Sequence, residues 1–556
     1  MLLPHHIAHL VAQAVEEAQR RELLPRGPLP DIEVEHPQEP DHGDLATSLP
    51  LRLARSARMS PLAIAQRLVP LLPADPAVER AWAAAPGFIN FSLRLPWLRQ
   101  QVEDVLRQGD AYGRGDLGQG QRVQVEFVSV NPTGPIHVGH ARGGVLGSAL
   151  AAVLEAAGYQ VSREYYINDA GSQIDAFRRT LYARYLQALG QDAPLPENAY
   201  QGSYMVSLAQ EAVAQHGDRF LRLPEPEAIN ALGEIGLQKM LAQIRDDLAR
   251  LRTDFDVWFS ERSLYGDGEY STALGLLREG GYLVERQGAL WFTSTALGDD
   301  KDNVLLKSTG EPTYFASDIA YHYNKFTTRG FHRVIDIWGA DHQGHVSRVK
   351  AAVAALGVEP QRLTIVISQL VTLKRGDEVL RLSKRTGEII TLRELLDEVG
   401  PDACRFFFLS RSPESQMEFD LELAKQQSEN NPVYYVQYAY ARIAGILRLA
   451  LERGLDYRQG DVSLLTDPAE AALIKKMLLL PELIETMALR LEPHHLPHYA
   501  VELATAFHWF YDHCRVVSSE PGEGSITLAR LKLVEACRIV LARALSLMGM
   551  TAPERM

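Results

Sequence analysis

Two histidines three residues apart, His137 and His140, are the side chains of this chain best suited to chemistry on a phosphate. They lie in the segment 131–140, which reads NPTGPIHVGH. At this spacing two imidazole rings share one helix face, so both can donate to the same phosphate group. Gly139 between them has no side chain, and a flat base can lie against its backbone. The alternative is a Pro/Gly turn whose histidines merely cap a helix.

A strand before the histidines and a helix after them would place both rings at the edge of a sheet. Residues 122–130 are rich in β-branched and aromatic types and have no helical period, which predicts a buried strand. Residues 141–154 are small and aliphatic at helical spacing. The histidines therefore open a helix directly after a strand, where a parallel sheet binds nucleotides. Free amides and the helix dipole favour phosphate there, so the segment predicts an ATP site.

Two later segments carry polar side chains that suit the same nucleotide. The segment 380–387, LRLSKRTG, offers hydroxyls and cations to a polyphosphate, although alone it is typical of a solvated basic loop. Residues 333–338 predict another strand, and Asp341 and His342 follow it. Polar residues at the carboxyl end of a parallel strand lie where ligands bind. We expect Asp341 and His342 to meet the adenosine.

The chain divides by pattern into three parts. Residues 1–112 predict an α+β N-terminal module. Residues 113–431 alternate strands and helices, which predicts an α/β doubly wound parallel-sheet nucleotide-binding catalytic domain, with a helical insertion around 168–251. Residues 432–556 are helical almost throughout and predict an all-α C-terminal bundle.

Composition limits the class of protein. The hydrophobic content of 46% in 556 residues is ordinary for globular chains, and no apolar run approaches the ~18 residues of a membrane span, so we expect no membrane partner. The three cysteines are widely spaced, which predicts neither disulfides nor a zinc site and favours the reducing cytoplasm. A net charge of −13 argues against indiscriminate nucleic-acid binding but permits a folded RNA partner.

The paired segments resemble the two signature motifs of class I aminoacyl-tRNA synthetases. Residues 137–140, HVGH, resemble the first, and residues 381–385, RLSKR, resemble the second. The second departs from the family pattern at Arg381, Leu382 and Arg385 but keeps the phosphate-contacting Lys384. The resemblance implies catalytic roles for His137, His140 and Lys384, and an ATP site formed by Pro135, His137, Gly139, His140, Asp341, His342, Ser383, Lys384 and Arg385.

Nearly the whole chain resembles the bacterial type of arginyl-tRNA synthetase. The matching segments are HGDLA at 42–46, PGFIN at 86–90, VEF at 125–127, NPTGP at 131–135, EYYINDAG at 164–171, YFASDIAY at 314–321, GADH at 339–342, FYDHCRV at 510–516 and LMGMTAPERM at 547–556. The resemblance implies an arginine–tRNA ligase that uses ATP, Mg²⁺, L-arginine and tRNA(Arg), here expected to be monomeric. Residues 1–112 are expected to contact the tRNA elbow and residues 432–556 the anticodon.

Arginine itself sets the chemistry of the amino-acid pocket. A guanidinium is planar and always charged, so it requires carboxylates and other acceptors in a fixed arrangement. Asp318 follows Tyr314 by one helical turn. By the resemblance, Glu126 or Asn131 holds the α-amino group while Tyr314 and Asp318 hold the guanidinium. Taken singly, each of these acids is as readily a surface carboxylate or a helix cap.

Three other readings compete with this one. A small-molecule nucleotidylyltransferase also uses His-x-Gly-His, but it needs neither the N-terminal module nor the aromatic-rich helical end. A non-catalytic tRNA-binding protein would not need to keep His137, His140 and Lys384 together. A cysteinyl-type synthetase needs thiolate zinc ligands, which the scattered cysteines do not supply.

Overall fold

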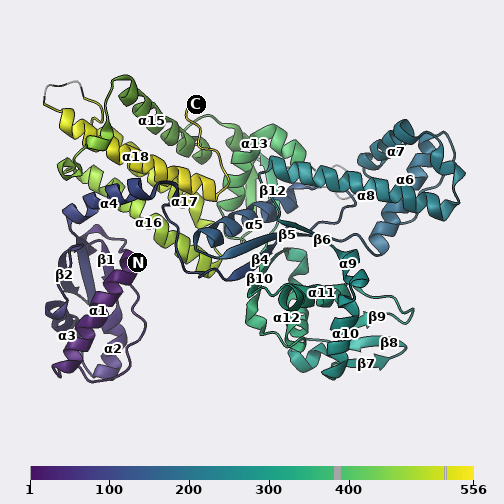
Figure 1. Cartoon of the computed structure of the whole chain (residues 1–556), viewed down its shortest axis with the longest axis horizontal. Helices are drawn as coiled ribbons and strands as arrows, with labels where there is room; N and C mark the ends of the chain where they lie inside the picture. The colour runs from purple at the N-terminus through teal and green to yellow at the C-terminus, as the bar shows by residue number, and fades with distance from the viewer. Residues whose placement is uncertain (1, 381–389, 519, 521) are drawn as a thin grey trace.

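A parallel sheet lies at the centre of the molecule (Figure 1). The computed structural model describes residues 2–380, 390–518, 520 and 522–556. Within these residues the sheet has five strands in the order β11, β10, β4, β5, β6, all parallel to their neighbours. Their bounds are β4 (Arg122–Glu126), β5 (Gln160–Ile167), β6 (Val257–Ser260), β10 (Arg333–Gly339) and β11 (Leu363–Ser368). The predicted doubly wound sheet is confirmed, and its direction of winding reverses beside β4, where such sheets bind ligands.

The helix that follows β4 packs directly on the sheet. This helix, α5 (Val138–Ala156), is apolar on nearly every side because it is buried between the sheet and other helices. Gly147 makes the close approach possible, since a Cβ there would lie 2.1 Å from Cγ of Phe127. The N-terminus of α5 is thereby held at the carboxyl end of β4.

The predicted helical insertion projects from the sheet between β5 and β6 (Figure 1). It consists of α6 (Ser172–Ala188), α7 (Ser203–His216) and the long α8 (Glu225–Arg250). The three helices pack on one another around their own apolar core, which contains Phe177, Leu181, Tyr185, Met205 and Phe220. The insertion is therefore a compact body with its own interior.

A second αβ unit lies between β6 and β10. It contains α9 (Glu261–Gly266), α10 (Glu269–Glu279), β7 (Leu283–Arg286), β8 (Ala289–Phe292), β9 (Asn303–Leu306) and α11 (Tyr314–Tyr323), which continues into a π-helical turn (Asn324–Thr328). The strands β7, β8 and β9 form an antiparallel sheet. That sheet is absent from the sequence-based expectation, because four-residue strands are too short to show a clear period.

The chain after β10 returns to the sheet and then leads to the C-terminal helices. The elements are α12 (Val346–Ala355), β12 (Val371–Arg375), β13 (Glu378–Leu380), α13 (Leu392–Leu409), β14 (Met417–Asp420) and α14 (Leu421–Lys425). Thr391 caps α13 through a reciprocal pair of hydrogen bonds with Glu394. This cap fixes where the chain re-enters helix after the second predicted motif.

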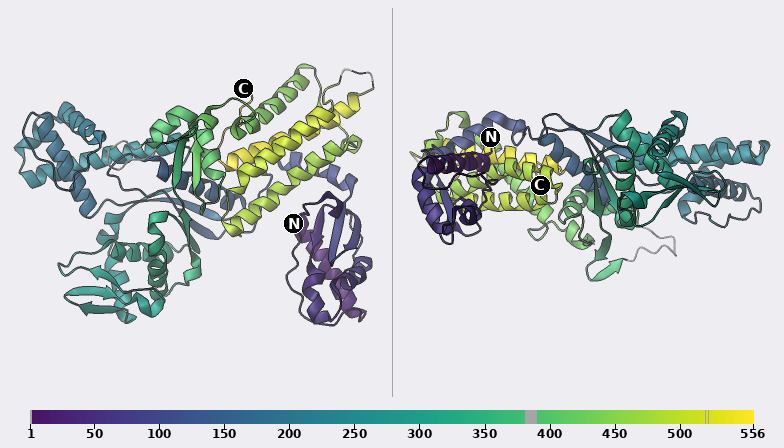
Figure 2. Two further views of the ribbon diagram at one scale, coloured as in Figure 1. Left: turned by 180° about the vertical axis from the view of Figure 1, so that it is seen from behind. Right: turned by 90° about the horizontal axis from the view of Figure 1, so that it is seen from below.

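The N-terminal residues fold around a core of their own. Helices α1 (Leu3–Arg20), α2 (Leu49–Ala57) and α3 (Pro61–Leu68) cover a sheet of β1 (Leu45–Thr47), β3 (Phe88–Leu93) and β2 (Val78–Ala84). Figure 2 shows this body beside the C-terminal helices. Ion pairs connect it to α16: His5 with Glu485 at 3.1 Å, His36 with Glu482 at 2.8 Å and Asp44 with Lys475 at 2.5 Å.

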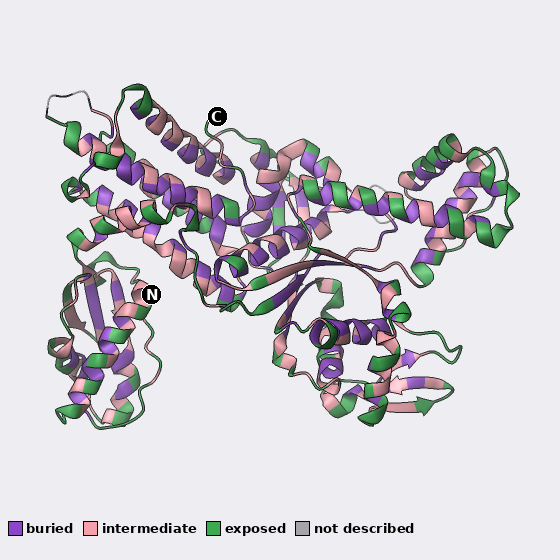
Figure 3. Ribbon diagram, in the orientation of Figure 1, coloured by how far each residue is buried: buried purple, intermediate pink, exposed green. Residues whose placement is uncertain are grey.

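The C-terminal helices share one core with the central sheet. They are α15 (Pro432–Glu452), α16 (Pro468–Arg490), α17 (His495–His513) and α18 (Gly524–Leu547). Figure 3 shows buried residues along their facing sides. Among the described residues we find no helix with the length and apolar content needed to cross a bilayer.

One helix of the expected N-terminal module packs elsewhere. Helix α4 (Leu95–Gln108) lies against α16 and α18, and its buried Leu98, Val102 and Val105 belong to the C-terminal core. The separate N-terminal core ends at the last strand before it, β3, although Leu93 also touches the larger core. The spacing of apolar residues predicts that a helix is buried but not which neighbour buries it.

Candidate active site

The backbone leaves the sheet sharply at the end of β4. The strand predicted to reach residue 130 ends at Glu126, and Val128 and Ser129 adopt positive φ angles of 69° and 42°. Such angles are costly for residues other than glycine and cluster at functional sites. The Ser129 hydroxyl donates to Oε1 of Glu126 at 2.9 Å and accepts from the Tyr166 amide at 3.1 Å. These bonds fix the turn that leads into the first motif.

The rings of the two histidines of the first motif lie close together at the start of α5, tilted by 32° to each other. Nδ1 of His137, the N-cap residue, accepts from the Gly139 amide at 3.1 Å, and the His137 and His140 ring centroids are 3.6 Å apart. A Cβ on Gly139 would lie 2.9 Å from Cε1 of the His137 ring, so a larger residue would displace that ring. Burial, together with the nearby His137, lowers the pKa of His140 to about 3. His140 is therefore a neutral imidazole at pH 7.

The backbone beyond the second motif pairs with the first motif. Ser383, Lys384 and Arg385, the predicted phosphate contacts of that motif, lie outside the described residues. The described chain resumes at Ile390, whose carbonyl accepts from the Val138 amide at 3.3 Å. The Leu392 amide donates to the Ile136 carbonyl at 2.8 Å. The segment that follows the second motif is thus hydrogen-bonded to the start of α5.

The residues predicted to meet adenosine lie at the end of β10. Asp341 and His342 belong to a 3₁₀ turn that follows the strand, and their side chains are 82% and 54% exposed. Pro135, also assigned to ATP, is half-buried in the loop before His137. All three residues are thus near carboxyl ends of adjacent strands, β10 and β4, with Asp341 and His342 open to solvent.

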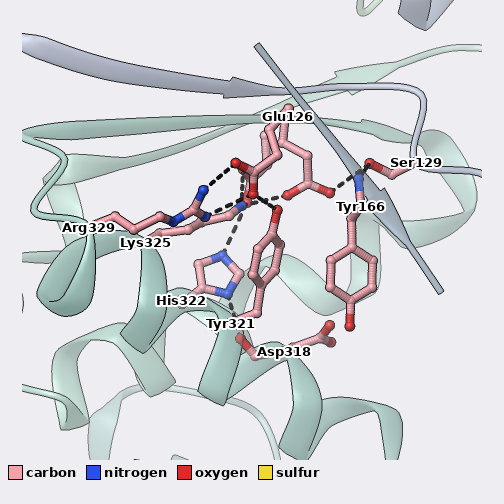
Figure 4. A network of polar contacts seen from close by, with 10 residues as sticks. Glu126, Ser129, Tyr166, Asp318, Tyr321, His322, Lys325 and Arg329 are labelled. Atoms are coloured by element: carbon pink, nitrogen blue, oxygen red, sulfur yellow. Dashed lines mark hydrogen bonds and ion pairs between the residues drawn. The ribbon is translucent and has the colours of Figure 1, made fainter. Parts of the chain in front are cut away.

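Tyr314 and Asp318 occupy the first turns of α11, as their spacing predicts. The Tyr314 ring is 46% exposed, whereas Asp318 is half-buried. Burial raises the pKa of Asp318 above its usual range, although His322 and Arg348 oppose the shift. Figure 4 shows the Asp318 carboxylate on the side of the site where the Tyr166 hydroxyl lies.

Glu261 is a site residue that the sequence reasoning missed. It is the first residue of α9 and only 3% exposed. Burial, with the negative charges of Asp318 and Asp169, raises its pKa to about 7, although hydrogen bonds from Ser317 and Tyr166 oppose the shift. Within the described residues neither Glu261 nor Asp318 forms an ion pair. Glu261 directly follows β6, at the edge of the sheet where ligands bind, and this position could have indicated its role from the sequence.

A buried ionic network centred on Lys325 lies near Asp318 (Figure 4). The fully buried Lys325 ammonium lies 2.5 Å from Oε2 of Glu126 and 2.8 Å from Oδ1 of Asp336. His322 contacts the other oxygen of Asp336 at 3.1 Å. Burial would raise the pKa of Asp336, but Lys325 and His322 hold it below its usual value. Each Glu126 oxygen therefore already has a partner, Lys325 or Ser129.

The network extends to a third acid on the neighbouring strand. Strand register places Glu126 beside Asp336 on one side and Glu164 on the other, so three acids form a row across the sheet. Glu164 is fully buried, accepts from the Tyr321 hydroxyl at 2.5 Å and pairs with Arg329. The π-helical turn after α11 thus supplies Lys325 and, next to it, Arg329 to neutralise the row.

Asn131, the remaining predicted arginine contact, is half-buried in the loop after β4. Its side-chain amide donates to Gln173 of α6. Glu126 and Asn131 thus lie at the end of β4 and in the loop that follows it, whereas Tyr314 and Asp318 lie one turn apart on α11. Their contacts with substrate stay predictions.

Comparisons with known proteins identify the family. The model "Arginyl tRNA synthetase N terminal domain" matches residues 5–93, "tRNA synthetases class I (R), catalytic domain" matches 101–409, and "DALR anticodon binding domain" matches 436–556. The arginine–tRNA ligase of Dehalococcoides mccartyi strain CBDB1 is 58% identical over 99% of this chain and 98% of its own length. That of Heliobacterium modesticaldum is 48% identical with the same coverage.

A solved structure shares the fold. The arginyl-tRNA synthetase of Thermus thermophilus superposes with a TM-score of 0.78 over all of both chains, at 24% identity. At that identity the likeness shows the fold alone. With the much closer relatives and the three matched models, it leads to one conclusion: the chain belongs to the class I arginyl-tRNA synthetase family.

Proposed function

We propose that this chain is an arginine–tRNA ligase, which activates L-arginine with ATP and transfers it to the 3′ end of tRNA(Arg). The observation that carries the proposal is the pair of acids Asp318 and Glu261. Burial raises the pKa of both, and within the described residues neither carboxylate forms an ion pair, although the more distant charges of His322, Arg348 and Lys325 act to lower the pKa of Asp318. A buried carboxylate without a cation is costly, so a positively charged ligand would stabilise this pair.

A guanidinium matches the surroundings of that pair. Its five N–H donors need acceptors in a plane, and two carboxylates can supply them. Tyr265 and Ser317 are hydrogen-bonded to each other at 2.7 Å, and Ser317 also contacts Glu261. The exposed Tyr314 ring at the start of α11 offers a flat surface over which a guanidinium can stack. In this proposal Asp318 and Glu261 hold the guanidinium, and Tyr314 covers it.

The α-amino group is assigned to Asn131 and Glu126. The Asn131 amide nitrogen donates to Gln173, which leaves its carbonyl oxygen to accept from an ammonium. Glu126 is nearly buried and already paired with Lys325, so it contributes negative potential with limited capacity for a further bond. We propose that Asn131 makes the direct contact and that the Glu126–Lys325 pair keeps the site shaped and nearly neutral beneath it.

Activation proceeds by attack of the arginine carboxylate on the α-phosphorus. The bond to the bridging oxygen breaks, pyrophosphate leaves, and a terminal ribose hydroxyl of the tRNA then takes the arginyl group as AMP departs. His137 and His140 are assigned to the α- and β-phosphates. Nδ1 of His140 is buried and, among the described residues, has no hydrogen-bond partner, so bound ATP could satisfy it. Because His140 is neutral, it stabilises developing charge by donating a hydrogen bond.

The remaining ATP contacts are assigned from the family resemblance. Lys384, with Ser383 and Arg385, is proposed to contact the departing pyrophosphate, while Asp341 and His342 meet the adenosine. Mg²⁺ is proposed to enter with ATP, coordinated by its phosphates, as is usual for nucleotide substrates. Among the described residues, no group of three or more His, Cys, Asp and Glu side chains is arranged to hold a metal by itself.

The outer modules are proposed to bind the tRNA. Residues 1–112 are assigned to the elbow and residues 432–556 to the anticodon. An aromatic surface on α15 and α17 supports the second assignment: the Arg442 guanidinium lies 4.7 Å from the Tyr438 ring and 5.0 Å from the Tyr511 ring. Unpaired RNA bases stack on such rings and guanidinium planes. We further propose that the enzyme acts as a monomer in the cytoplasm.

The decisive experiment is aminoacylation of total tRNA with each amino acid offered separately. Charging with arginine alone is expected, because a pocket built for charged hydrogen bonds rejects analogues that lack them by roughly 10⁴-fold or more. Charging with another amino acid in preference to arginine would refute the proposal. We also expect pyrophosphate exchange to require tRNA, through induced fit of the site, and exchange without RNA would reject that requirement alone.

A further inference from the structure

The loop between β4 and α5 is held in place by hydrogen bonds from side chains of other elements. This loop, residues 131–135, contains two prolines, which have no N–H to donate. The Thr133 carbonyl accepts from the Tyr204 hydroxyl at 2.7 Å. Immediately before the loop, the Val130 carbonyl accepts from the Tyr165 hydroxyl at the same distance. Tyr165 belongs to the central sheet, whereas Tyr204 belongs to α7 of the helical insertion.

Two glycines allow Tyr204 to reach the loop. A Cβ on Gly134 would lie 3.1 Å from the Tyr204 hydroxyl oxygen, so a larger residue would press on it. A Cβ on Gly202 would lie 2.3 Å from Cε1 of the same ring. Thr133 is itself buried, and burial raises the pKa of Tyr204 far above neutrality. The hydroxyl therefore stays protonated and donates to a carbonyl shielded from water.

The insertion contacts the loop at a second point. Gln173 of α6 accepts from the Asn131 side chain, two residues before Thr133. Helix α6 packs on both α7 and α8 around the insertion's own core. Both contacts, through Tyr204 and Gln173, thus come from one packed body, so a displacement of that body would move the loop at both points.

We infer that the helical insertion sets the position of the substrate-binding loop, with Tyr204 as its main positioning residue and Gln173 as the second. The inference rests on the proposed function, since the loop carries Asn131, assigned to arginine, and Pro135, assigned to ATP. Thr133 lies midway between them. Loss of the hydrogen bond from Tyr204 to the Thr133 carbonyl should therefore weaken the binding of both arginine and ATP, while the elements assigned to tRNA stay intact.

Tyr204→Phe tests this, because it removes one hydroxyl and keeps the ring. Loss of a buried hydrogen bond should raise the KM for arginine and for ATP by about fivefold to tenfold, with kcat and the KM for tRNA changed less than about twofold. A purely structural role would lower the fraction of active enzyme instead. The dissociation constant of ATP alone, from titration calorimetry, should rise by a similar factor, and this readout does not depend on arginine specificity.

The matched control is Tyr185→Phe. Tyr185 lies in the core of the same insertion, and its hydroxyl donates to the Gly217 carbonyl at 2.6 Å rather than to the loop. Removal of the Tyr185 hydroxyl should leave the KM values for arginine and for ATP unchanged. A second variant, Gln173→Ala, should raise the KM for arginine in the unaltered chain but not in an Asn131→Ala background. Unchanged constants and unchanged ATP affinity in Tyr204→Phe, or an equal increase in Tyr185→Phe, would overturn the inference.

Discussion

The binding of arginine should depend on pH through Glu261. Its pKa is raised to about 7 by burial and by the neighbouring carboxylates, and we propose that the guanidinium needs the ionised form. With this pKa, about a tenth of Glu261 is ionised at pH 6 and about nine tenths at pH 8. The KM for arginine should therefore be about tenfold higher at pH 6 than at pH 8.

Steady-state aminoacylation with saturating ATP and tRNA, at intervals between pH 6 and pH 8, measures this dependence. Glu261→Gln should remove the titration and raise the KM at pH 8 by about thirtyfold or more, the effect of losing a charged partner worth at least about 2 kcal/mol. Glu279→Gln, an exposed acid on the neighbouring α10, is the matched control and should behave like the unaltered chain. A pH-independent KM in the unaltered chain would refute the assignment of Glu261 to the guanidinium.

Further predictions follow from the same contacts. Glu261→Gln should raise the free energy of unfolding by up to about 3 kcal/mol at pH 8 and by much less at pH 4.5. A carboxyl whose pKa is raised in the folded state destabilises the fold as pH rises from about 4.5 to 7, and the substitution removes that cost. Urea unfolding at both pH values measures the difference. Lys325→Met should destabilise the fold by about 3–5 kcal/mol by removing the cation that Glu126 and Asp336 share. Lys374→Met, which removes an exposed pair with Glu418, should cost less than about 1 kcal/mol in the same assay. His140→Ala should lower kcat by about 10²-fold, and an increase in the KM for ATP with kcat unchanged would assign it to uniform binding. Deletion of residues 1–93, which spares α4, should raise the KM for tRNA by about tenfold or more with the KM for arginine unchanged, and an unchanged KM for tRNA would contradict the elbow assignment.

Local pattern alone predicted the parts of this site that lie close together in sequence. The strand before the histidines, the helix after them and the one-turn spacing of Tyr314 and Asp318 all agree with the structure. Each depends on the period of one element and on its capping residues, which a short stretch of sequence carries. The doubly wound sheet was predictable for the same reason, since its strands alternate with helices along the chain.

The buried ionic network around Lys325 depends on how strands that are distant in the sequence pair with one another. Glu126, Glu164 and Asp336 are neighbours only because three parallel strands pair in one register, and Lys325 reaches them from a π-helical turn that no sequence period indicated. Tyr204 likewise contacts Thr133, which lies 71 positions before it in the chain. The sequence alone determined the helices and strands that have a clear period and the side chains suited to phosphate, but not the short strands β7, β8 and β9, the π-helical turn or Glu261. Tertiary packing decided which buried charges neutralise one another and which carboxylates are left for a ligand, because those pairings follow from contacts between segments far apart in the chain.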